Sequence, residues 1–204
     1  MENQELNNEI RKEFQLDRII LFTDAVFAIV ITLTAIEIRL PEHSDESIQQ
    51  QLFELLPVIF AYVVSFLFIG QIWYQHLKLF SLIRDFDKGL IVRNLLMLFW
   101  LGFLPFSVTL IARKSSFISI CIYFSVIFLC RGAQLLLQHY ILVKRPNLRH
   151  EIGMEDELLR FKKSRLAMLL LAVVFILVTS TMLLIDDPEL SNIAWWWFVP
   201  FPSC

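Results

Sequence analysis

The sequence predicts an all-α integral membrane protein, built as a bundle of six transmembrane helices. Of its 204 residues, 57% are hydrophobic, 14% are aromatic and only 19% are charged. Soluble domains are about 45–50% apolar and about 25% charged. The apolar residues also fall in long blocks that are sufficient to cross a bilayer, which short amphipathic repeats are not.

Each predicted span is one apolar block bounded by polar segments. The spans run over residues 18–40, 52–80, 89–112, 117–143, 166–185 and 190–201. Pro105 is expected to kink the third span. The sixth span is short and contains three consecutive tryptophans, a cluster typical of the membrane interface, so it is either a short span or an interfacial helix. No segment indicates a separate soluble domain, and residues 1–204 are expected to form a single unit.

The basic residues predict the orientation of the bundle. An even number of spans places both termini on the same side, and a cytoplasmic position puts 14 of the 18 Lys and Arg residues inside. These are Arg11, Lys12, Arg18, Lys78, Arg84, Lys88, Arg93, Lys144, Arg145, Arg149, Arg160, Lys162, Lys163 and Arg165. Such a bias follows the positive-inside rule. The protein is therefore predicted to be a multi-pass membrane protein with both termini in the cytoplasm.

The first span carries polar residues that an inert membrane helix would not need. Asp24 lies within it, and a carboxylate at membrane depth costs roughly 2.5–3.5 kcal/mol on insertion scales. At about 100° per residue, Ile29, Thr32, Leu33 and Ile36 form one stripe along the helix. This stripe either packs against neighbouring helices, with the threonine hydroxyl bonded to its own backbone, or lines a pore in which the threonine is the polar group.

Asp24 needs hydrogen-bond donors from another span. Trp73 and His76, one turn apart near the end of the second span, have N–H groups suited to a carboxylate, which predicts a polar cluster between the first two helices. Asn94 at the start of the third span and Arg131 in the fourth are further candidates. Arg131 is deep enough to require a carboxylate or carbonyl partner, and a structural role is expected for both.

No enzyme is indicated. The sequence has no HExxH, GxSxG or P-loop motif and no paired intramembrane carboxylates. Its three cysteines have neither a CxxC nor a Cys/His metal spacing, so no metal site is expected. A net charge of −2 gives no reason to expect nucleic-acid binding. The carbonyl filter motif TVGYG is also absent, which excludes a conventional potassium channel.

One arrangement of residues resembles a known family. Arg18 is followed by Phe22-Thr23-Asp24 and then by the run Ala28-Ile29-Val30-Ile31-Thr32-Leu33. Trp73, His76, Arg93-Asn94 and Leu104-Pro105-Phe106 follow in order. This arrangement resembles the transmembrane protein 175 family, which comprises the endolysosomal potassium channel and its bacterial relatives. The family motif has serine at the position of Thr23, so the hydroxyl is retained, and a single six-helix unit is similar to the bacterial type.

The resemblance implies a potassium-permeable, potassium-selective cation channel of the bacterial plasma membrane. Four copies would form a homotetramer whose first helices line a central pore, with potassium as the permeant ion, no cofactor and membrane lipids as the other partner. Ile29 would form the main constriction, Leu33 and Ile36 further apolar layers, and Thr32 would be linked to selectivity. The polar network that holds the pore helices would comprise Arg18, Phe22, Thr23, Asp24, Trp73 and His76.

Two other functional classes remain open on the sequence. A proton-coupled transporter or proton leak pathway would use intramembrane titratable groups, of which Asp24 and Arg131 are the plausible ones. A membrane scaffold without transport would need only helix packing. Ion flux discriminates the channel from the scaffold. Dependence of a proton-coupled flux on Asp24 discriminates the transporter from the channel.

Overall fold

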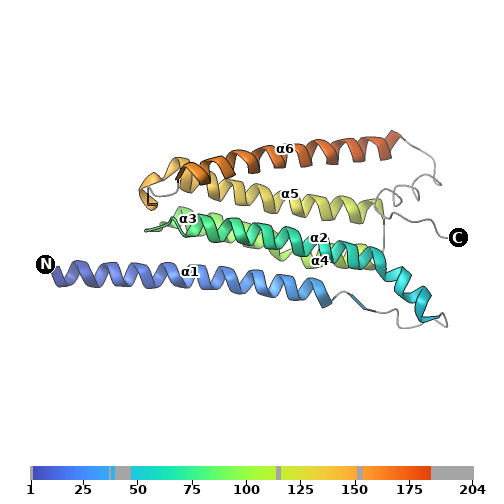
Figure 1. Cartoon of the computed structure of the whole chain (residues 1–204), viewed down its shortest axis with the longest axis horizontal. Coiled ribbons are helices and arrows are strands. Elements are labelled where there is room, and N and C mark those ends of the chain that lie inside the picture. The colour runs from blue at the N-terminus through green and yellow to red at the C-terminus, as the bar shows by residue number, and fades with distance from the viewer. Residues whose placement is uncertain (1, 37, 40–46, 114–115, 151–153, 185–204) are drawn as a thin grey trace.

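The computed structural model is a bundle of long helices lying side by side (Figure 1). It describes residues 2–36, 38–39, 47–113, 116–150 and 154–184. The helices are α1 (Glu2–Ile36), α2 (Ile48–Phe80), α3 (Lys88–Gly102), α4 (Leu104–Arg113), α5 (Phe117–His139) and α6 (Met154–Leu184). A π-helical turn (Tyr140–Lys144) and a short 3₁₀ helix (Pro146–Leu148) connect α5 to α6. The predicted all-helical fold is confirmed.

Four segments of the described chain are long and apolar enough to cross a membrane. They are Glu9–Ile36, Ile48–Phe80, Lys88–Ala112 and Phe117–Lys144, in the order of the first four predicted spans. The predicted fifth span lies in the second half of α6, whose residues 166–184 carry no charge. The sixth, 190–201, lies outside the described residues. The count of six therefore stays a prediction.

Side-chain caps and one proline set several helix boundaries. Ser47 and Gln50 form a capping box at the start of α2, and the Asp87 carboxylate accepts a hydrogen bond of 2.7 Å from the Leu90 N–H at the start of α3. The predicted kink in the third span is a break at Phe103, between α3 and α4. Pro105 then lies in the first turn of α4, where its missing N–H costs no helical hydrogen bond.

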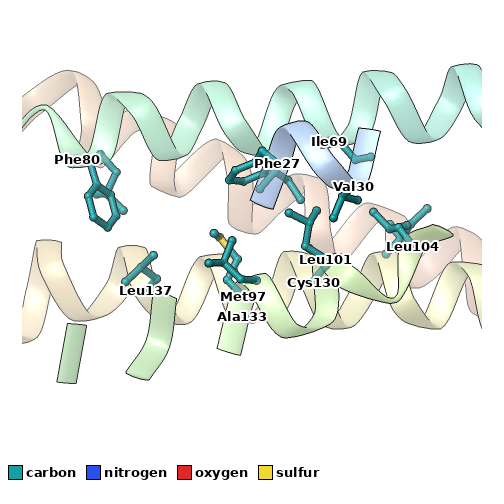
Figure 2. Packing of buried hydrophobic residues seen from close by; sticks show 14 of the residues in the cluster. Phe27, Val30, Ile69, Phe80, Met97, Leu101, Leu104, Cys130, Ala133 and Leu137 are labelled. Atoms are coloured by element: carbon teal, nitrogen blue, oxygen red, sulfur yellow. The ribbon is translucent and has the colours of Figure 1, made fainter. Parts of the chain in front are cut away.

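The core joins helices from both halves of the chain. Figure 2 shows Phe27 of α1 and Ile69 of α2 in one cluster with Met97 of α3 and Leu137 of α5. These side chains are almost completely buried. Burial of a large apolar side chain contributes about 1.5–3 kcal/mol in water. Inside a membrane, where lipid tails are also apolar, close packing of this kind holds helices together instead.

The end of the bundle where α3 begins is fixed by interactions around Tyr140. Its hydroxyl donates a hydrogen bond of 2.6 Å to the Asp87 carboxylate, and the Arg93 guanidinium lies 3.9 Å from the ring centroid. Gly89 makes this approach possible, because a Cβ there would clash with the Tyr140 hydroxyl. These contacts tie α3 to the end of α5 and so fix the position of Asn94, which directly follows Arg93 in α3.

Candidate functional site

Helix α1 has two faces of different character. One face is buried against the rest of the chain and carries Leu16, Thr23, Phe27, Val30 and Thr34 at spacings of seven, four, three and four residues. These spacings repeat one side of an α-helix. α1 is therefore held in one rotation about its own axis, and its other side is turned away from the chain's own core.

The exposed face carries the stripe singled out in the sequence. Ile29, Leu33 and Ile36 are 55%, 44% and 48% exposed in the single chain. They follow one another at spacings of four and three residues, so they form a continuous aliphatic surface along one side of the helix. The chain thus presents a branched apolar stripe that the described residues leave uncovered.

Thr32 is the polar residue within this stripe, and it is also exposed. Its hydroxyl oxygen lies 2.8 Å from the Ile29 carbonyl oxygen and 3.2 Å from that of Ala28. The hydroxyl therefore donates its hydrogen to its own backbone, as one of the two sequence interpretations expected. This leaves the lone pairs of the oxygen free to face outward, where they can accept a donor or approach a cation.

A buried polar relay lies behind the stripe and joins three helices. Asn94 of α3 donates a hydrogen bond of 2.8 Å to the Thr23 hydroxyl of α1, which in turn donates one of 2.8 Å to the Ile19 carbonyl. The Asn94 side-chain oxygen lies 3.0 Å from Nε2 of His76 in α2. Because an amide oxygen can only accept, His76 donates here from Nε2. We call Thr23, Asn94 and His76 the α1–α3–α2 relay.

A second contact between α1 and α2 lies beside the relay. The Trp73 indole N–H donates a hydrogen bond of 2.9 Å to the Asp24 carboxylate. Of the two candidate donors, Trp73 bonds Asp24, whereas Nε2 of His76 bonds Asn94. The ring of His76 also stacks on Phe80, with 3.9 Å between centroids, which fixes its direction.

Arg18 and Phe22 are not brought into the relay. Both are exposed on α1. Within the described part of the chain, neither makes a hydrogen bond, ion pair or ring contact with the relay residues. Of the six residues that the resemblance assigns to a polar network, a single protomer therefore brings together Thr23, Asp24, Trp73 and His76. Asn94, which the sequence offered only as a further candidate, is the central member.

Comparison with known proteins finds a family similar to part of this chain. The sequence profile of the family described as endosomal/lysosomal potassium channel TMEM175 matches residues 18–105, the region that holds the stripe, the relay and the Trp73–Asp24 contact. Over these residues, this chain is similar to the TMEM175 family. The resemblance read from the sequence motifs is confirmed.

Several relatives of this chain are bacterial. It is 35% identical over 88 residues to a protein named potassium channel from Chryseobacterium sp. (strain P1-3), and the match covers 43% of this chain and 44% of that one. It is 34% identical over 108 residues to a potassium channel of Chamaesiphon minutus, covering 52% of this chain and 53% of the relative. The matches thus span about half the length of these relatives.

Solved structures agree on the fold over a larger part of the chain. A crystal structure described as a lysosomal potassium-selective channel TMEM175 homolog from Chamaesiphon minutus superposes with a TM-score of 0.60 at 26% identity, covering 85% of this chain and 99% of that one. A crystal structure of a point variant of the potassium channel MtTMEM175 superposes with a TM-score of 0.56 at 21% identity, covering 90% and 88%. The second likeness shows the fold alone.

The chain has another polar cluster, deep between α2, α5 and α6. One Arg131 nitrogen donates to the side-chain oxygens of Gln75 at 2.8 Å and of Gln134 at 2.6 Å, and the other donates to the Ser164 hydroxyl at 3.1 Å. The partner expected for Arg131 was a carboxylate or a carbonyl, and the amide carbonyls provide it.

Among the described residues, no group of three or more His, Cys, Asp or Glu side chains could hold a metal ion.

We expect Trp73→Phe to weaken the docking of α1 onto α2. The change keeps the aromatic ring but removes the indole N–H, so Asp24 loses its donor. A hydrogen bond to a charged group contributes about 1.5–3 kcal/mol, and we expect about 1 kcal/mol here because Trp73 is partly exposed. Denaturation in mixed detergent micelles measures the loss. Trp100→Phe in α3 is the matched control, and an equal loss in both variants would argue against the contact.

Proposed function

We propose that four copies of this chain assemble with their α1 helices around a common axis and form a passive, potassium-selective cation channel. The observation that carries this proposal is the exposed stripe of α1, which has one outward-facing hydroxyl and lies opposite a face fixed by buried polar contacts. One copy has too few polar groups to line an aqueous path. A ring of identical stripes would line one, and the names of the bacterial relatives support potassium as the permeant ion.

The apolar residues would form the gate. At 1.5 Å rise per residue, Leu33 lies about 6 Å and Ile36 about 10 Å along the axis from Ile29. Four copies of each would stack as successive apolar rings. A narrow apolar ring blocks ions by steric contact and by loss of water, and it opens when the helices splay or rotate. Ile29 is the proposed main constriction.

Thr32 would supply the polar ring next to the Ile29 constriction. Since its hydroxyl hydrogen is given to the backbone, the oxygen would face the permeant cation with its lone pairs. Four such oxygens could replace part of the hydration shell of potassium, as ring-like filters do. This is the proposed role of Thr32 in selectivity.

The relay and the Trp73–Asp24 contact would hold α1 in the rotation that aims the stripe at the axis. A turn of one residue, about 100°, would remove Ile29 from the axis and bury a different side of the helix. Arg18 and Phe22 belong to the proposed network through a neighbouring copy, since both are exposed in the single chain. The network is thus proposed to couple folding of one chain to assembly of four.

The proposed setting is the bacterial plasma membrane, with six spans in each chain and both termini in the cytoplasm. Lipids and the other copies are the partners, and neither nucleic acid nor a cofactor takes part. We expect no catalytic activity. A proton-coupled or proton leak pathway is the second candidate, because vertebrate relatives such as that of Danio rerio, 29% identical over 97 residues, are named proton channels.

Ion flux into liposomes that contain purified protein tests the proposal. We expect potassium to enter faster than sodium, and Thr32→Ala to reduce this preference. Thr179→Ala in α6 is the matched control, because the Thr179 hydroxyl makes the same two backbone contacts, at 2.9 Å to Phe175 and 3.0 Å to Ile176. Absence of flux from intact oligomers would refute the channel. Proton-coupled flux that Asp24→Asn abolishes would support the second candidate.

A further inference from the structure

Helix α6 changes character part-way along its length. Residues 155–165 include three acidic and four basic side chains, whereas residues 166–184 carry no charge. The acidic side chains all belong to the first turn of the helix, so the basic ones lie next to the uncharged run. Charged side chains are costly in hydrocarbon, so a helix enters it where its charges end. In the proposed membrane arrangement, residues 160–165 therefore lie at the level of the lipid headgroups.

The guanidinium of Arg131 lies at the same level, although Arg131 belongs to the apolar part of α5. One of its nitrogens donates to the Ser164 hydroxyl at 3.1 Å, and Ser164 directly precedes Arg165, the last charged residue of α6. Its other partners are the amide oxygens of Gln75 and Gln134. All three partners are neutral, and within the described residues Arg131 makes no ion pair. These bonds hold the guanidinium in place but leave its positive charge uncompensated.

Two further cations gather around Tyr74 of α2. The Lys78 ammonium of α2 lies 5.7 Å from the centroid of the Tyr74 ring, and the Arg160 guanidinium of α6 lies 5.9 Å from it. Arg160 lies one turn before Ser164, the partner of Arg131, on the same face of α6. We call Lys78, Arg131 and Arg160, which come from α2, α5 and α6, the three-helix basic cluster.

Among the described residues, the carboxylate paired with this cluster is that of Glu157. Glu157 is buried, and one of its oxygens lies 3.2 Å from a nitrogen of Arg160. The same nitrogen is buried and makes no hydrogen bond within the described part of the chain. Burial raises the pKa of Glu157, while the positive charges of Arg160 and Lys78 oppose that shift. Three positive charges thus face one carboxylate, and the cluster keeps a positive excess.

An exposed apolar surface continues from the cluster along the uncharged part of α6. Lys163, Leu166 and Leu170 follow Arg160 on one side of the helix at spacings of three, three and four residues. Leu166 and Leu170 are each 59% exposed. Figure 1 shows α6 and α1 at opposite edges of the bundle, so α6 lies on the lipid side when α1 faces the proposed axis. Positive charge and apolar surface are thus arranged to match a negative headgroup and its acyl chains.

We infer that the three-helix basic cluster binds the phosphate of an anionic phospholipid from the inner leaflet, whose acyl chains lie along Leu166 and Leu170. The inference rests on the proposed function, in which this end of the bundle faces the cytoplasm. The three cations are each partly exposed, so a phosphate can reach them. Basic side chains between helices at the inner membrane surface suit anionic headgroups, and guanidinium groups bind phosphate by paired hydrogen bonds. The phosphate would supply the negative charge that Arg131 lacks.

Thermal unfolding of the full chain in neutral detergent micelles tests this site. A ligand that binds the folded state raises Tm. We expect added phosphatidylglycerol to raise Tm several-fold more than added phosphatidylcholine, whose choline group cancels the phosphate charge. Lys78→Gln with Arg160→Gln should remove most of this difference, because two of the three charges are lost. Each variant is compared with itself in the two lipids, so a change in its basal stability does not affect the result.

Lys162→Gln with Arg165→Gln is the matched control. Both residues are exposed and basic at the same level of α6, but they lie about 160° and about 140° around the helix from Arg160. We expect this pair to keep the preference for phosphatidylglycerol. The charge-conserving pair Lys78→Arg with Arg160→Lys should also keep most of it. Equal losses in the two neutralised pairs would indicate attraction to basic residues in general and would overturn the inference.

The remaining outcomes separate the possible occupants of the cluster. If phosphatidylglycerol does not stabilise the wild-type chain more than phosphatidylcholine, another copy or another segment covers the cluster and the inference is wrong. If inorganic phosphate alone raises Tm as much as phosphatidylglycerol, the site takes free phosphate and the lipid assignment fails. Potassium-selective flux without a lipid preference would refute this inference alone. A lipid preference without flux would refute the channel and leave the lipid site standing.

Discussion

Replacing Ile29 by alanine should increase potassium flux through the reconstituted protein by about tenfold or more, equivalent to a barrier lower by about 1.4 kcal/mol. Ile29 is exposed on α1 and is the proposed narrowest ring, so four copies would lose their bulk together. A wider ring holds water more readily and presents a smaller barrier to a hydrated ion. The rates at which potassium and sodium enter liposomes that contain the protein measure both the flux and the preference for potassium.

Ile176→Ala is the matched control for this experiment. Ile176 is an isoleucine of similar exposure on α6, and Figure 1 shows α6 and α1 at opposite edges of the bundle. We expect its replacement to leave flux near the wild-type rate. Equal increases in both variants would indicate general loosening of the bundle, and no increase in either would place the constriction elsewhere.

Replacing Asn94 by leucine is expected to lower the free energy of unfolding by about 2–4 kcal/mol, because two buried partners lose their hydrogen bonds at about 1–3 kcal/mol each. These are the Thr23 hydroxyl and the His76 ring nitrogen, which Asn94 joins at 2.8 Å and 3.0 Å. Leucine has the same branching as asparagine and a larger volume, so the change leaves no cavity, and the loss combines the missing polar contacts with tighter packing. Denaturant titration in mixed micelles measures it.

Gln71→Leu provides the comparison for Asn94→Leu. It makes the same amide-to-leucine change on an exposed position of α2. Surface substitutions away from special features usually change stability by less than about 0.5 kcal/mol. If both variants lost the same free energy of unfolding, the loss would come from the introduction of leucine, and the hydrogen bonds of the relay would not be its cause.

The local polar contacts could be predicted partly from the sequence. The costly carboxylate of Asp24 required a donor from another helix, and the Trp73 N–H is that donor at 2.9 Å. The position of Asn94 could not be predicted in this way. It joins residues 71 and 18 positions away along the chain, so its role depends on how α3 lies between α1 and α2.

For Arg131, too, the sequence predicts the need for a partner, and only the packed structure shows which partner it is. Its depth in an apolar block required a carboxylate or carbonyl partner, because a bare guanidinium is costly there. Which oxygens would serve was open, since two of the three partners lie on helices brought together only by packing. Gln75 and Ser164 lie 56 and 33 residues away in the chain.

Composition and spacing within single helices were enough to predict the all-helical membrane class, the resemblance to the TMEM175 family and the stripe of α1. Helical geometry converts such spacing directly into a face, so no knowledge of neighbouring helices was needed. The packed bundle was required to show which side of α1 is buried, that Asn94 links Thr23 to His76, and that Arg18 and Phe22 stay exposed. These features depend on distances between helices, which side-chain packing sets and the order of residues along one helix does not contain.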